Sequence, residues 1–176
     1  MTSTPFMSRA NGFTLIEIVV AVAIMALLAT AAAFSFSRPL HRARAVEAIE
    51  QIRYLDSSSR DFARRFGRNV QIAFDLSENA IERREGTSHD ATFSAQIASP
   101  LRIEAVWTAG RRINDGEAII PVSSLGISPT YAVKLSGPQG ERWVVVTGLA
   151  GETATYSDDE QIQAIFSTIA PRRDAD

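Results

Sequence analysis

The sequence has no cysteine, and Lys134 is its only lysine among 18 basic residues. The absence of cysteine excludes a disulfide bond, a thiol nucleophile and a cysteine-ligated zinc site. Only His41 and His89 can supply an imidazole, and neither stands in the spacing of a nucleophile with its base. A glycine-rich phosphate loop followed by lysine is also missing from the sequence. These residues predict a protein that is not an enzyme and that needs no cofactor.

The 176 residues give room for one modest domain and a membrane segment. The net charge of -2 conceals an uneven distribution. From Arg38 to Arg68, eight arginines stand against four acidic residues, a balance of +4. From Asp115 to the end, nine acidic residues stand against four basic ones, a balance of -5. Such opposed halves suit packing between related subunits, and they equally suit two ordinary solvated faces.

Charge is almost absent from residues 13–37, where Glu17 is the single ionisable side chain. The run exceeds the roughly 20 apolar residues that a helix needs to cross a bilayer. It therefore predicts a transmembrane helix over residues 13–37. A cleaved secretory signal peptide is the alternative, with a small-residue cleavage site near residues 31–33. A carboxylate in hydrocarbon is costly, so Glu17 is a candidate functional residue that needs a partner.

The stretch GFTLIE, Gly12 to Glu17, followed by an apolar helix, closely resembles the type III signal of type IV pilins and type II secretion pseudopilins. The resemblance implies that a prepilin peptidase removes residues 1–12 by cutting between Gly12 and Phe13. Phe13 then becomes the N-methylated first residue of the mature chain. The resemblance also implies a single-pass inner-membrane protein with its C-terminal domain in the periplasm. Met7 as the true start would leave a six-residue leader, MSRANG.

The same resemblance gives Glu17 a partner. It would be the fifth residue of the mature chain, and in these filaments that glutamate is thought to neutralise the amino terminus of a neighbouring subunit. The physical reason is that a carboxylate paired with an ammonium group is tolerated where a lone buried carboxylate is not. Glu17 is therefore predicted to set the register of assembly.

Beyond the apolar run, hydrophobic residues recur every three or four positions from Leu40 to Phe66, as on one face of a helix. This predicts an amphipathic periplasmic half of the same long helix over residues 38–66.

After Gly67 the period of the hydrophobic residues changes to two, as in half-buried strands. Leu101, Ile103, Ala105 and Trp107 are predicted on one sheet face. Further strands are predicted within the following segments: 69–75, 118–122 as an edge strand because of Pro121, and a hairpin over 130–148.

These patterns predict an α+β protein with a pilin-like fold: a long N-terminal helix packed on an antiparallel β-sheet domain of residues 67–176. The segments 44–75 and 119–152 resemble H-type minor pseudopilins and their FimT relatives. In that family an arginine-containing helix end leads into a first strand, and a hairpin precedes a closing glycine-containing strand. The sequence departs from many major pilins because Phe34 stands roughly where they carry a helix proline.

Acidic residues Asp158, Asp159 and Glu160 precede a short periodic run near the carboxyl end. Clustered carboxylates can bind calcium, and major pseudopilins carry a calcium site near their carboxyl end. Acidic residues are also what the first turn of a helix prefers. We favour the helix start, with calcium as the weaker alternative and no other metal site predicted.

Aromatic and basic residues offer further candidate sites. Trp107 and Trp143 lie in strand patterns beside valines, which favours core packing over interface anchoring.

Several arginines could bind phosphate, and FimT-like minor pilins are linked to DNA uptake. However, acids interleave the terminal PRRDAD and no aromatic stacking platform adjoins it, which favours solvated faces or subunit contacts over nucleic acid. The arginines concerned are Arg64, Arg65 and Arg68 with Arg111 and Arg112 or Arg172 and Arg173.

The combined prediction is a minor pseudopilin of a type II secretion system that joins the tip complex to the shaft of the pseudopilus. Its predicted partners are the major pseudopilin, other minor pseudopilins, the prepilin peptidase and the inner-membrane assembly platform. One alternative is a minor pilin of a type IV pilus, with a role in DNA uptake. A second alternative is a secreted or membrane-anchored binding protein in which GFTLIE is coincidental.

Overall fold

The computed structural model describes residues 14–169, without the side chains of residues 31–39. The chain divides into two compact units, Met1–Leu40 and His41–Asp176. Helix α1, Leu15–Phe66, supplies the described part of the first unit and the opening of the second. Residues 38–66 are thus helical, and their location in the periplasm stays a prediction.

The first unit contains the amino-terminal turns of α1. Large apolar residues occur on every side of this helix between Leu15 and Leu28, and each of them is more than half exposed. Within the residues described, no helix includes a stretch long and apolar enough to cross a membrane. The predicted span of residues 13–37 includes Phe13 and the side chains of residues 31–37, which lie outside the described part of the chain.

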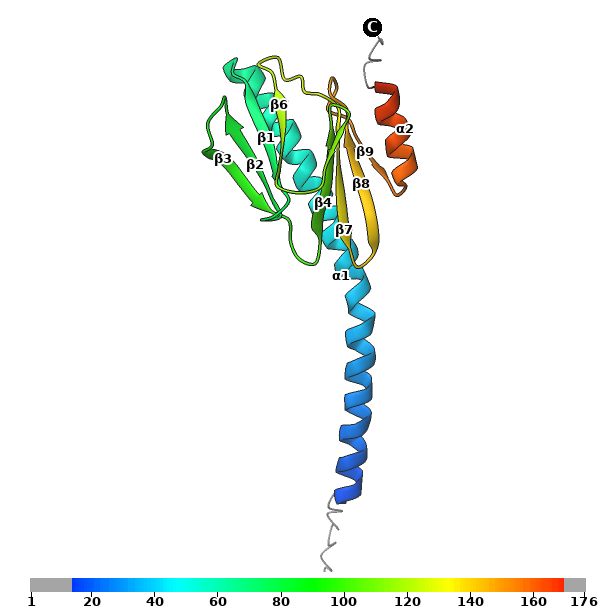
Figure 1. Cartoon of the computed structure of the whole chain (residues 1–176). Coiled ribbons are helices and arrows are strands. Elements are labelled where there is room, and N and C mark those ends of the chain that lie inside the picture. Colours follow the sequence, from blue (N-terminus) through cyan, green and yellow to red (C-terminus); the bar gives the residue numbers. More distant parts are fainter. Residues whose placement is uncertain (1–13, 170–176) are drawn as a thin grey trace, which may run out of the picture. The chain divides into compact units, whose positions relative to one another are not determined.

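The second unit contains two antiparallel sheets, which confirms the predicted antiparallel β-sheet domain (Figure 1). Sheet A has the strand order β3-β2-β1-β6 and sheet B the order β5-β4-β7-β8-β9. Sheet A consists of β1 Val70–Asp75, β2 Ala80–Glu85, β3 Ala91–Gln96 and β6 Glu117–Val122. Sheet B consists of β4 Arg102–Thr108, β5 Arg111–Ile113, β7 Tyr131–Gly137, β8 Gly140–Val146 and β9 Thr153–Tyr156.

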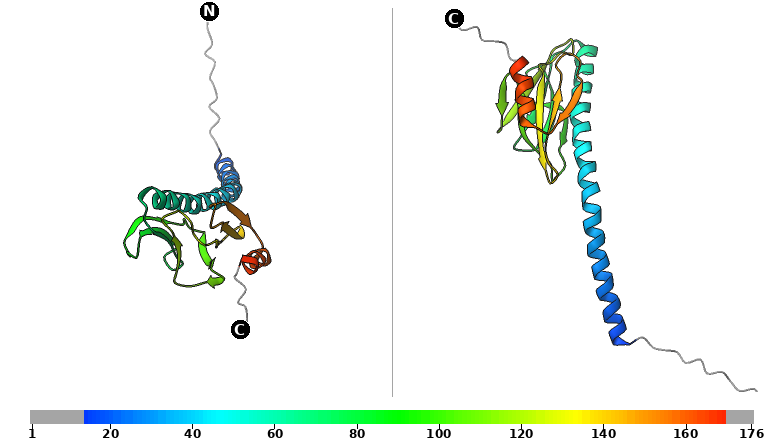
Figure 2. Two further views of the ribbon diagram at one scale, coloured as in Figure 1. Left: turned by 90° about the horizontal axis from the view of Figure 1, so that it is seen from above. Right: turned by 90° about the vertical axis from the view of Figure 1, so that its right-hand side faces the viewer.

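One hydrophobic core joins the second-unit part of α1 to both sheets. Ala48, Ile52, Leu55 and Ala63 supply the buried apolar side chains of the helix. Of the residues on the predicted apolar face, Ile52 and Leu55 are buried, whereas Leu40 and Phe66 at its two ends are exposed. Figure 2 shows this part of the helix along one side of the strands. The inward side chains of the strands complete the core, including Val70, Ile72 and Phe74 of β1, Ile120 of β6, Val133 of β7 and Val144 of β8.

A second, smaller core lies on the other face of sheet B, under helix α2, Asp159–Ile169. Ile162 and Phe166 of α2 pack on Trp143 and Val145, and the ring of Trp107 stacks on Phe166 at 5.3 Å. Sheet B is thus buried on both faces in its centre. This is why its strands read as apolar runs such as WVVV rather than as simple alternation.

The predicted single face of strand β4 is wrong. The register of β4 with β7 shifts between Ile103 and Ala105, which marks a bulge at Glu104. Ile103 therefore faces the α1 core, whereas Ala105 and Trp107 face the α2 core. A single extra residue in a strand exchanges the faces of all the residues after it, which explains the error.

Candidate functional site

The predicted processing residues, Gly12 and Phe13, lie outside the described residues. Description begins at Thr14, which precedes the first residue of α1. The Thr14 side-chain oxygen accepts a hydrogen bond from the backbone N–H of Glu17 at 3.3 Å, and its carbonyl accepts from the same N–H at 3.0 Å. Thr14 is therefore the N-cap of the helix, with Glu17 three residues later, as in a capping box.

Glu17 is exposed in the first turn of α1. A carboxylate there meets the positive end of the helix dipole, which stabilises the helix start. Glu17 thus has a local structural role that the sequence reasoning missed. The Thr-x-x-Glu spacing of TLIE, which is typical of a helix start, indicated this role. The exposed carboxylate of Glu17 stands at the head of a helix whose large apolar side chains are also exposed.

Among the described residues of the second unit, Arg60 forms the most side-chain hydrogen bonds. It was not singled out in the sequence analysis. Its side chain is 3% exposed, and it forms an ion pair with the equally buried Asp56 at 2.6 Å. The guanidinium also donates to the carbonyl oxygens of Gly148 at 2.7 Å and Gly126 at 3.1 Å, and to the Ser128 hydroxyl at 2.7 Å. A planar group with five N–H donors suits such a set of acceptors, whereas lysine would not.

Asp56 extends this cluster to strand β7. The Tyr131 hydroxyl donates to Asp56 Oδ1 at 3.0 Å, and Tyr131 is fully buried. Burial, followed by the charge of Asp56, raises the pKa of Tyr131 well above its ordinary value, so the phenol remains protonated as a donor. The cluster therefore fastens α1 to the β6–β7 loop, the β8–β9 loop and sheet B.

The two loops approach each other at Gly148, and the helix at Gly126, closely enough to require glycine at both positions. A Cβ at Gly148 would lie 2.2 Å from the Ser128 carbonyl oxygen, and Gly126 has φ +74° with the side chain of Arg64 beside it. The signal for this cluster is in the sequence, because Asp56 and Arg60 fall on the apolar face defined by Ile52, Leu55 and Ala63. Charged residues at core positions indicate a buried pair.

The predicted helix start at the acidic cluster is confirmed. Helix α2 begins at Asp159, and the Asp158 carboxylate accepts a hydrogen bond from the Glu160 backbone N–H at 2.9 Å. Asp159 accepts from the Trp143 indole N–H at 2.6 Å and lies near Arg112 and Lys134. Among the described residues, no group of three or more histidine or acidic side chains is arranged to hold a metal ion.

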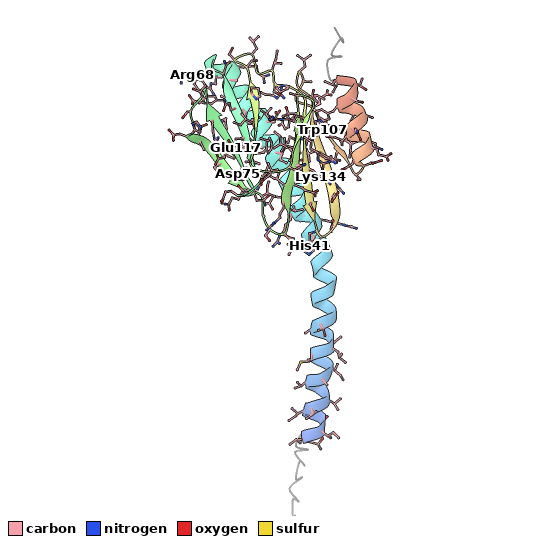
Figure 3. All side chains as sticks on the ribbon, in the orientation of Figure 1. His41, Arg68, Asp75, Trp107, Glu117 and Lys134 are labelled. Atoms are coloured by element: carbon pink, nitrogen blue, oxygen red, sulfur yellow. The ribbon has the colours of Figure 1, made fainter. Side chains whose placement is uncertain are left out.

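Lys134, the only lysine, is buried beneath α2 on sheet B, where Figure 3 places it below Trp107. Its ammonium contacts Glu141 at 2.6 Å and Glu104 at 3.1 Å. Burial alone would lower the pKa of Lys134, but the hydrogen bonds to Glu141 and Glu104 outweigh it and raise the pKa. Lys134 and Asp159 together tie the start of α2 to the sheet.

Asp159 makes the attachment of α2 dependent on pH. The hydrogen bond from Trp143, aided by the charges of Lys134 and Arg112, lowers the pKa of Asp159 below its ordinary value. A carboxylate with a lowered folded-state pKa contributes stability that is present above about pH 4 and is lost as the pH falls through the folded pKa. We expect Asp159→Asn to lower the urea midpoint at pH 7, and we expect this difference from the parent to shrink progressively as the pH is lowered below about 4. A difference independent of pH would contradict this assignment.

Several of the remaining predicted site residues contact other side chains. Trp143 is buried and Trp107 half-buried in the α2 core, as the core interpretation predicted. Arg64 forms an ion pair with Asp61, and Arg68 with Glu85 at 3.1 Å. Arg112 lies 3.4 Å from Asp159, whereas Arg172 and Arg173 lie outside the described residues.

Comparisons with known proteins give two findings. A family model for the prokaryotic N-terminal methylation motif matches residues 7–33. The fold is similar to that of the minor pseudopilin EpsH from the Type 2 Secretion System of Vibrio cholerae, with a TM-score of 0.52. The two chains share 10% sequence identity, and the match covers 66% of this chain and 97% of the EpsH chain. No curated protein matches the sequence. The predicted methylation motif and the predicted pilin-like α+β fold are thus confirmed.

Proposed function

We propose that this chain is a minor pseudopilin of a type II secretion system. The observation that carries the proposal is the conjunction of a methylation motif over residues 7–33 with the fold of EpsH in the same chain. Either feature alone is less specific, because the motif also occurs in type IV pilins and a fold is compatible with several functions. The proposed role is assembly rather than catalysis.

The proposed subunit is anchored in the inner membrane through the amino-terminal part of α1, with the second unit in the periplasm. The supporting observation is that the apolar side chains from Leu15 to Leu28 are exposed in the single chain. A helix that is apolar all round is stable when lipid or other helices surround it. In the proposed pseudopilus the major pseudopilin and other minor pseudopilins provide these helices, and the subunit joins the tip complex to the shaft.

Processing by a prepilin peptidase tests the first step of this proposal. We expect the amino-terminal peptide of the mature chain to begin at Phe13 and to carry one methyl group, as measured by mass spectrometry. In a strain without the peptidase, the same chain should retain its leader. A mature chain that begins within residues 31–34 would instead indicate a cleaved signal peptide and would contradict the proposal.

A further inference from the structure

The strand at the outer edge of sheet A is unusually open to a partner. Strand β3, Ala91–Gln96, pairs with β2 on one side only. Its sequence, ATFSAQ, contains neither charge nor proline, the features by which proteins usually protect an edge strand. The opposite edge of sheet A, strand β6, contains Glu117 and Pro121 and is protected in this sense.

An open hollow of about 270 Å³ lies between α1 and this edge. Since a water molecule occupies about 30 Å³ in the liquid, the hollow has room for a long side chain. Four of its residues come from α1 and one from β3: Glu47, Glu50, Gln51, Tyr54 and Phe93. All five belong to the second unit, so the hollow is part of one compact body.

The chemistry of the hollow matches a cation with several N–H donors. Glu47 and Glu50 are exposed, and the only ion pair between them and the described residues joins Glu50 to the exposed Arg53 at 3.1 Å. Exposed pairs of this kind contribute little and exchange readily. The rings of Tyr54 and Phe93 lie 6.1 Å apart and provide an aromatic wall. A guanidinium can stack on such a wall while it donates to carboxylates.

We propose that this hollow binds an arginine side chain of another protein, presented by an extended segment that adds to the free edge of β3. Residues of β3 alternate, and Phe93 and Ala95 point to the core side, where they pack against the α1 core. A directly opposed residue on an added strand would have its Cβ about 5 Å from the Cβ of Phe93, beside the hollow. Main-chain hydrogen bonds would supply affinity and the arginine specificity, as in other cases of strand addition.

The experiment uses the full chain in a mild detergent and a fluorescent peptide of sequence Thr-Val-Thr-Arg-Thr-Val-Thr, measured by fluorescence anisotropy. In an extended conformation its arginine and both valines share one face. Matched probes replace the arginine with citrulline, which keeps the shape without the charge, or with lysine. A further probe carries N-methyl groups on alternate backbone amides, so that it cannot form the ladder.

We expect the arginine probe to bind at least about tenfold more tightly than the citrulline probe, since charge-assisted hydrogen bonds are the strong ones. The variant Glu47→Gln with Glu50→Gln should weaken the arginine probe to a similar extent. The control variant Glu78→Gln with Glu152→Gln removes two exposed carboxylates outside the hollow and should leave binding unchanged.

Several results would overturn the proposal. These are no binding of the arginine probe, equal binding of arginine and citrulline probes, or equal losses in the two double variants. Equal affinity for the lysine probe would overturn the choice of a guanidinium, and undiminished binding of the N-methylated probe would overturn strand addition. This inference does not rest on the proposed function, because the probes report binding whether or not the chain acts in secretion.

Discussion

Replacing Arg60 by methionine is expected to destabilise the second unit by about 3–5 kcal/mol, the cost of leaving one member of a buried ion pair without its partner. Asp56 would remain buried with only the Tyr131 hydroxyl as a donor. The carbonyl oxygens of Gly126 and Gly148 would also lose their guanidinium partner. Urea unfolding of the full chain in detergent, followed by tryptophan fluorescence, measures the free energy of unfolding.

Two further variants separate the buried cluster from charge in general. Arg64→Met removes an exposed arginine one helical turn away and should cost about 1 kcal/mol or less, because exposed ion pairs contribute little. Combining Arg60→Met with Asp56→Leu removes both buried charges and should recover part of the loss. Recovery should be incomplete, because the loop carbonyls and Tyr131 still lack partners. A small effect of Arg60→Met would show that the loops are held by other contacts.

Replacing Glu17 by glutamine is expected to lower incorporation into filaments by about tenfold or more. This corresponds to a free-energy loss of about 1.4 kcal/mol, less than the usual cost of breaking a buried ion pair. The prediction follows from the proposed pairing of Glu17 with the amino terminus of a neighbouring subunit, since glutamine keeps the shape of the side chain but cannot neutralise that amino terminus. The measurement is the amount of this chain in sheared filaments relative to the amount in the membrane.

Thr14→Ala is the matched control for Glu17→Gln. It removes the side-chain oxygen that accepts from the Glu17 backbone N–H, but it keeps the carboxylate. Incorporation of this variant should stay within about twofold of the parent, because the loss of the cap, typically about 1 kcal/mol, weakens the helix start in the membrane and in the filament alike. If both variants lose incorporation equally, Glu17 acts through the helix start rather than through a neighbouring subunit.

The sequence pattern predicted the elements with strong periodicity. Strand β1, the edge strand β6, the β7–β8 hairpin and helix α2 all lie where the alternation, the proline and the acidic helix start placed them. Strand β2 was missed because Ala80–Glu85 contains four charged residues. Three of these charges have partners outside β2: Arg83 lies over the Phe62 ring at 4.7 Å, Arg84 pairs with Glu117, and Glu85 pairs with Arg68. Such partners are invisible to a local pattern.

The same limit applies to the candidate sites. The GFTLIE motif could be recognised from sequence because its spacing is local. For the Arg60 cluster, the position of Asp56 and Arg60 on the apolar helix face was a local signal of a buried pair, but their partners could not be predicted, because the acceptors Gly126, Ser128 and Gly148 lie 66 to 88 residues away along the chain. The hollow beside β3 also required the structure, since β3 itself was not predicted and the hollow joins it to α1.

The most direct test of the secretion role is deletion of the gene, followed by comparison of the extracellular proteins and of DNA uptake with those of the parent strain. The account predicts that several exported proteins are lost from the medium, that DNA uptake is unchanged, and that the intact gene restores secretion. Normal secretion together with lost DNA uptake would contradict the account and would make this chain a minor pilin of a type IV pilus.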